Sequence, residues 1–93
     1  MTVYEQMVVK IIAVQEAIMG PLAIDQANEV KDLEVDWDKH SASITGNSVQ
    51  AVEDLITKYS LLFGRTSVEV SKDAVATLMY DLGPQEIPHS LRN

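Results

Sequence analysis

Three carboxylates and a histidine stand at alternate positions in one short segment of this 93-residue chain: Glu34, Asp36, Asp38 and His40. Alternate residues of a β-strand project from the same face, about 7 Å apart. Clustered carboxylate oxygens are the ligands that Ca²⁺ and Mg²⁺ prefer. One interpretation is therefore a metal-dependent enzyme or sensor built on these four residues. The other interpretation, which we favour, is a solvated strand face whose charges prevent edge-to-edge pairing, because the spacing is not that of an EF-hand.

A wider acidic cluster surrounds this segment. Six of the fourteen acidic residues lie within fourteen positions, and Lys31 is the only cation among them. The six are Asp25, Glu29, Asp32, Glu34, Asp36 and Asp38. Because complementary electrostatic fields steer association, the cluster predicts a docking surface for a protein partner. A plain solvated surface is the alternative.

The remaining polar residues form no catalytic pattern. The two histidines, His40 and His89, stand in separate segments, and no serine occupies a G-x-S-x-G turn. No phosphate-binding or dinucleotide-binding glycine pattern occurs, and the chain has no cysteine to supply a thiolate ligand. We therefore expect a non-catalytic protein without a cofactor.

Composition and charge limit the classes of protein to which this chain can belong. Hydrophobic residues make up 46% of the chain and charged residues 23%, which is typical of one globular domain. The net charge is −7, and the seven Lys and Arg residues are spread along the sequence, so we expect no binding to nucleic acid or to an anionic membrane. No apolar run approaches the roughly 18–20 residues of a membrane span, and the start lacks the basic region of a secretory signal. The expected location is the cytoplasm.

Helical periodicity dominates the sequence and repeats itself. A wide apolar face runs from Val3 to Met19 and stops at Gly20, and a second runs from Val49 to Phe63 and stops at Gly64. A further helical pattern follows each glycine at once, so the two units are offset by 44 residues. Between them, strict alternation over residues 33–38 predicts the first strand of a β-hairpin at about 33–45.

The predicted fold class is mainly α with a small β component (α+β). It consists of two helix-Gly-helix units, about four helices in all, joined by a short β-hairpin and related by a pseudo-two-fold repeat. Residues 1–84 are expected to form one compact domain, and residues 85–93 a flexible C-terminal tail, which together with the acidic hairpin is the candidate surface for a partner.

The predicted helical core is compatible with two different functions. Helix 3–19 is apolar on more than one side, and small residues stand in register at Ala23 with Ser67 and Ala27 with Ser71. These features favour a self-associating interaction or regulatory protein, with a homodimer as the simplest form. The alternative is a binder of a small apolar ligand, whose pocket between the helix pairs would be lined by Met7, Ile11, Tyr59, Phe63 and Met79.

Overall fold

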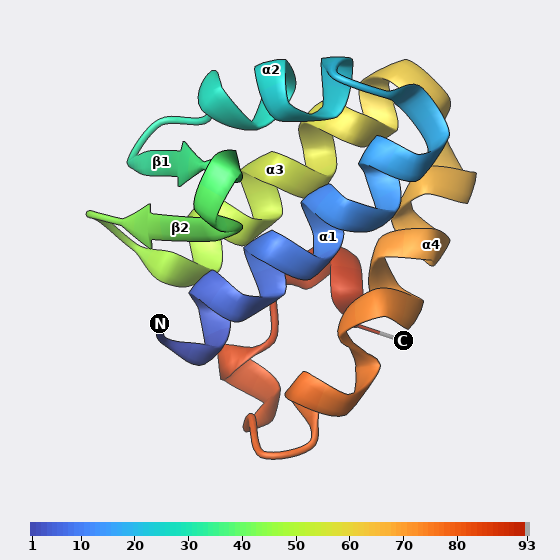
Figure 1. Ribbon diagram of the computed structural model, residues 1–93. Coiled ribbons are helices and arrows are strands. Elements are labelled where there is room, and N and C mark those ends of the chain that lie inside the picture. The colour runs from blue at the N-terminus through green and yellow to red at the C-terminus, as the bar shows by residue number, and fades with distance from the viewer. Residues whose placement is uncertain (93) are drawn as a thin grey trace.

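The computed structural model describes residues 1–92 and is mainly helical, with four α-helices and one antiparallel hairpin, as predicted (Figure 1). The elements follow in the order α1 (Val3–Met19), α2 (Leu22–Asn28), β1 (Leu33–Asp36), β2 (Ser41–Ile44), α3 (Ser48–Phe63) and α4 (Arg65–Val75). Short 3₁₀ turns cover Trp37–Lys39, Ala76–Met79, Pro84–Glu86 and His89–Leu91.

Helix α1 is the central element of the core. Thr2 caps its N-terminus: the Thr2 side chain accepts a hydrogen bond from the Glu5 N–H, and the Glu5 carboxylate accepts one from the Thr2 N–H. Its neighbours are α2, α3, α4 and β2. Five of its residues are buried: Met7, Val8, Ile11, Ile12 and Gln15. The wide apolar face that favoured a dimer is therefore covered largely by the chain itself.

Two glycines reverse the chain in the same way. Gly20 has φ 67° and ψ −150°, and Gly64 has φ 69° and ψ −154°. This backbone region is essentially restricted to glycine. The N–H of Gly20 donates to the carbonyl of Glu16 at 2.8 Å, and that of Gly64 to the carbonyl of Ser60 at 2.7 Å. The two predicted helix-Gly-helix units thus share one corner geometry.

Hydrogen bonds between the units repeat at the same 44-residue offset. The Gln15 side-chain N–H donates to the Ser67 carbonyl at 3.0 Å, and the Tyr59 hydroxyl donates to the Ala23 carbonyl at 2.6 Å. Gln15 matches Tyr59, and Ser67 matches Ala23. Each unit's first helix therefore holds the other unit's second helix at an equivalent point. The small side chains of Ser67 and Ala23 permit this close approach of the helices, and both residues are buried.

The hairpin forms, but its first strand is shorter than the sequence predicted. Leu33 pairs with Ile44 and Asp36 with Ser41. After Asp36 the backbone turns into a 3₁₀ turn, and His40 takes a left-handed conformation at φ 49°. The Trp37 ring N–H donates to the Glu16 carboxylate on α1 at 3.1 Å, which ties the turn to the helix.

The C-terminal segment, expected to be a flexible tail, lies against the core over its described residues 85–92. Leu91 is buried, and the Tyr4 hydroxyl donates to the Glu86 carbonyl at 2.6 Å. The Ser90 N–H donates to the Glu53 carboxylate of α3 at 2.7 Å. The segment contains too few apolar residues to show a periodic pattern, so its packing gave no sequence signal.

Replacing Gly64 with alanine tests the corner geometry. An added Cβ would meet no atom within 4 Å, so the expected cost is backbone strain alone, about 1–3 kcal/mol of unfolding free energy. Gly83→Ala is the matched control, because Gly83 has φ −70° and its added Cβ would meet, at 3.1 Å, only the end of the flexible Glu86 side chain, which can move aside. Urea denaturation of both variants measures the difference. Equal losses of unfolding free energy in the two variants would contradict the inference that a residue other than glycine is strained at position 64.

Acid should weaken the attachment of the hairpin to α1. The Glu5 carboxylate accepts hydrogen bonds from the backbone N–H groups of Thr2 and Ile44, which hold its pKa below the ordinary value. A lowered pKa in the folded state contributes stability above the unfolded-state pKa, and this contribution is lost as the pH falls through the folded-state value. The native chain should therefore be more stable than Glu5→Gln at pH 7, and the difference should shrink at pH 3.

Urea unfolding of both proteins at the two pH values gives this comparison. Glu34→Gln, at an exposed position of β1, is the control and should change stability little. A loss in Glu5→Gln that is equally large at both pH values would contradict the role of the charged Glu5 carboxylate.

Candidate functional site

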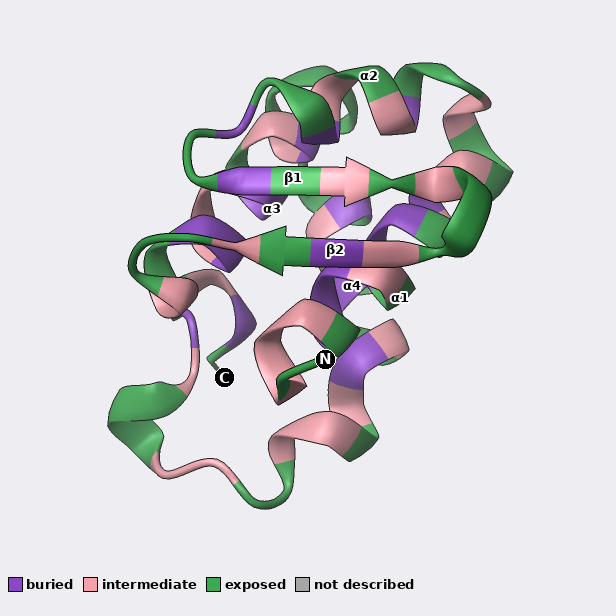
Figure 2. Cartoon of the chain, turned by 60° about the vertical axis from the view of Figure 1, so that its left-hand side comes forward, coloured by how far each residue is buried: buried purple, intermediate pink, exposed green. Residues whose placement is uncertain are grey.

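The predicted acidic surface is exposed along its whole length. Asp25 lies on α2, Glu29 directly follows the helix, Asp32 lies in the turn after it, and the last three acids lie on β1 and the 3₁₀ turn that follows. Exposed residues occur along α2 and both strands of the hairpin (Figure 2). Within the described chain, the Lys58 ammonium and the Gln26 side-chain amide each lie 3.5 Å from the Glu29 carboxylate. The surface is therefore open to solvent.

The four residues of the possible metal site are not gathered. Residues 1–92 contain no group of three or more His, Asp or Glu side chains placed to hold a metal ion. Asp38 lies on the 3₁₀ turn and not on the strand, so it leaves the alternating face. The His40 ring lies 4.5 Å from the Trp37 ring. The turn after Asp36 thus separates side chains that the strand pattern would have aligned.

The residues of the possible apolar pocket are also distributed among different environments. Met7, Ile11 and Tyr59 are fully buried in the core. Burial raises the pKa of the Tyr59 hydroxyl far above its ordinary value, so this group stays protonated as a hydrogen-bond donor. Phe63 is 47% exposed at the end of α3, and Met79 lines a separate surface cavity. The structure therefore does not bring these five residues together.

A group of exposed apolar side chains, which we call the corner patch, surrounds the two glycine corners. It consists of Ile18, Leu22, Leu61, Leu62 and Phe63. Ile18 is 49% exposed and its equivalent Leu62 is 47% exposed, while Leu61 reaches 81%. The patch was not predicted, because these residues fit the apolar periodicity of helices that were expected to be buried.

The hydrogen bonds of the core place both corners at one end of the molecule. Gln15 and Tyr59 each stand five residues before a corner glycine, and their acceptors Ser67 and Ala23 each stand three residues after the other glycine. Ile18 follows Gln15 by three positions and Leu62 follows Tyr59 by three, which puts each pair on one helix face. In Figure 1 the two corners lie together at the upper right, and the hairpin lies at the other end of α2.

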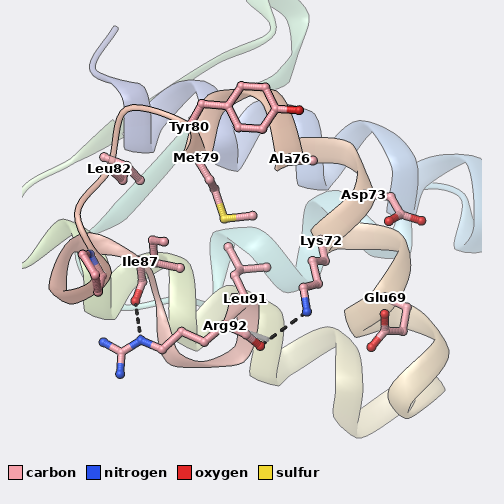
Figure 3. Close-up of a pocket in the computed structure, with 11 residues that line it drawn as sticks. Glu69, Lys72, Asp73, Ala76, Met79, Tyr80, Leu82, Ile87, Leu91 and Arg92 are labelled. Carbon is pink, nitrogen blue, oxygen red and sulfur yellow. Dashed lines mark hydrogen bonds between the residues drawn. The ribbon is translucent and has the colours of Figure 1, made fainter.

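A second feature is a cavity of about 720 Å³ between α4 with its 3₁₀ extension and the C-terminal segment (Figure 3). An adjoining cavity of about 520 Å³ shares Glu69, Lys72 and Arg92 with it. Sequence reasoning missed both cavities, because their two walls are distant in sequence and one wall was expected to be mobile.

No protein-family model matches the chain, and neither a curated protein nor a solved structure matches it. Within residues 1–92, every helix is too short or too polar to cross a membrane. The candidate functions therefore depend on the geometry of the corner patch, the acidic surface and the cavities.

Proposed function

We propose that this protein is a small non-catalytic interaction or regulatory protein that forms a homodimer through the corner patch. The observation that carries the proposal is the exposure of five large apolar side chains at one end of an otherwise well-packed chain. Clustered exposed apolar residues mark interaction sites, because leaving them in water is unfavourable. The acidic surface stays available for a second protein partner, in the cytoplasm as the sequence leads us to expect.

Symmetry supports a second copy of this chain as the occupant. A two-fold contact places the same patch of both copies face to face, so each apolar group meets another apolar group. The corner patch suits this arrangement because it contains equivalent residues from both repeat units, such as Ile18 and Leu62. A stable interface buries about 800 Å² per partner. The corner patch would form its apolar centre, and neighbouring polar residues such as Thr66 would form the rim.

Charge supports the same arrangement. Each copy carries a net charge of −7, so association must keep the acidic regions apart. The hairpin, with Glu34, Asp36 and the following Asp38, lies at the opposite end of α2 from the corners (Figure 1). A corner-to-corner dimer therefore separates the two acidic hairpins and leaves both exposed.

Light scattering tests the proposal through the solution mass at two concentrations that differ about a hundredfold. We expect a mass near that of two chains at the higher concentration. The double variant Ile18→Ser with Leu62→Ser should shift the mass to that of one chain, because it removes two equivalent apolar groups from the interface.

Tyr80→Ser is the matched control, since Tyr80 is 81% exposed but lies beyond α4 in the segment far from the corners. It should dimerise like the native chain. The proposal is contradicted if the native protein has the mass of one chain at both concentrations. It is also contradicted if the double variant still forms a dimer.

A further inference from the structure

The larger cavity beside α4 has an apolar interior. Its walls include Met79 and Leu82 on one side and Ile87 and Leu91 on the other, with Ala76 between them. Figure 3 shows the Met79 thioether pointing into the space between the 3₁₀ turn and the C-terminal segment. A volume of about 720 Å³ is within the range of small-molecule sites, which are mostly apolar with a few polar groups. The interior therefore suits an apolar ligand body.

Positive charge gathers where the two cavities meet. Arg65, Lys72 and Arg92 are three of the seven Lys and Arg residues in an acidic chain, and all three line the smaller cavity with His89. Glu69 is the one acidic residue in that lining, and it lies 3.8 Å from Arg65. These cations are spread along the sequence and come together only in the fold. A bound anion at the shared mouth of the two cavities would therefore lie near more positive than negative side chains.

Lys72 and Arg92 are the cations common to both cavities. The Lys72 ammonium donates to the Arg92 carbonyl at a long 3.4 Å, and the Arg92 Nε–H donates to the Ile87 carbonyl at 3.1 Å (Figure 3). An ammonium has three N–H donors and a guanidinium has five, so both groups have further donors for a ligand. In Figure 3 the Arg92 guanidinium is turned toward Ile87, on the other side of the Arg92 carbonyl from the Lys72 ammonium, so the two cations stand apart at the edge of the apolar space.

From this combination we propose that the cavity binds an aliphatic carboxylate. The hydrocarbon chain lies among Met79, Leu82, Ile87 and Leu91, and the carboxylate pairs with the Lys72 ammonium, with the Arg92 guanidinium adding attraction from farther away. A single negative charge fits better than a doubly charged phosphate, because Glu69 and Asp73 also line the larger cavity and would repel additional charge. This site is separate from the corner patch, so it does not depend on the proposed dimer.

Methyl NMR of the methionines provides a direct test with decanoate, kept below its micelle concentration. The chain has four methionines at different places. Met79 lines the cavity, Met7 is buried in the core, and Met19 ends α1 beside Gly20. We expect a saturable shift of the Met79 methyl signal and no shift of Met7 or Met19. Decanol lacks the charge and acetate lacks the chain, so each should bind much more weakly than decanoate.

Single substitutions test the contribution of the cations to binding while leaving the apolar lining of the cavity unchanged. Lys72→Gln should weaken decanoate binding about twofold to fivefold, the effect of losing one partly exposed ion pair, and Arg92→Gln should weaken it less, because its charge acts from farther away. Lys39→Gln, on the exposed turn of the hairpin, is the matched control and should bind like the native chain. The unchanged Met7 signal in each variant shows that the core remains folded.

Several results would overturn the proposal. The site is absent if Met79 does not shift, and it is not an anion site if decanol binds as tightly as decanoate. A shift of Met19 in place of Met79 would put the ligand at the corner patch. Equal weakening by Lys39→Gln would mean that only the overall charge matters. None of these results depends on whether the chain forms a dimer.

Discussion

The two glycine corners are the constraint on which the rest of the structure depends. At each corner the chain leaves one helix and enters the next through a backbone conformation that only glycine adopts at low cost. This reversal sets the second helix of each unit against the first helix of the other. The Gln15–Ser67 and Tyr59–Ala23 hydrogen bonds then satisfy two buried donors at equivalent points. The apolar face of the central helix α1 is buried as a result.

The same constraint determines which surfaces stay exposed. Because both corners lie at one end, the last apolar residues of α1 and α3 meet solvent there, including Ile18 and Leu62. The acidic hairpin lies at the other end of α2, and the C-terminal segment follows α4 along α3 and α1. An apolar end, an acidic end and a cationic cavity are therefore separated on one small molecule. Such separation would let the proposed self-association, partner binding and ligand binding take place without competition.

The sequence predicted the elements that periodicity and helix-stopping residues define. The apolar faces ending at Gly20 and Gly64 gave both units, and alternation after Leu33 gave the hairpin. The sites were harder to predict because they depend on tertiary contacts. The strand pattern failed after Asp36, where the Trp37 contact with Glu16 favours a turn. Leu91 carried no pattern, yet it is buried, and Arg65, Lys72 and Arg92 meet only after the C-terminal segment packs on α4.

The central claim is that two copies associate corner to corner, and a spin-label distance measurement tests it most directly. The chain contains no cysteine, so Leu61→Cys and Asp38→Cys each provide one labelling site per copy. A label at position 61 should give a short intermolecular distance, because Leu61 is 81% exposed in the corner patch. A label at position 38 should give a much longer distance, because the hairpins lie at the far ends. The reverse order, or no intermolecular coupling at position 61, would contradict the account.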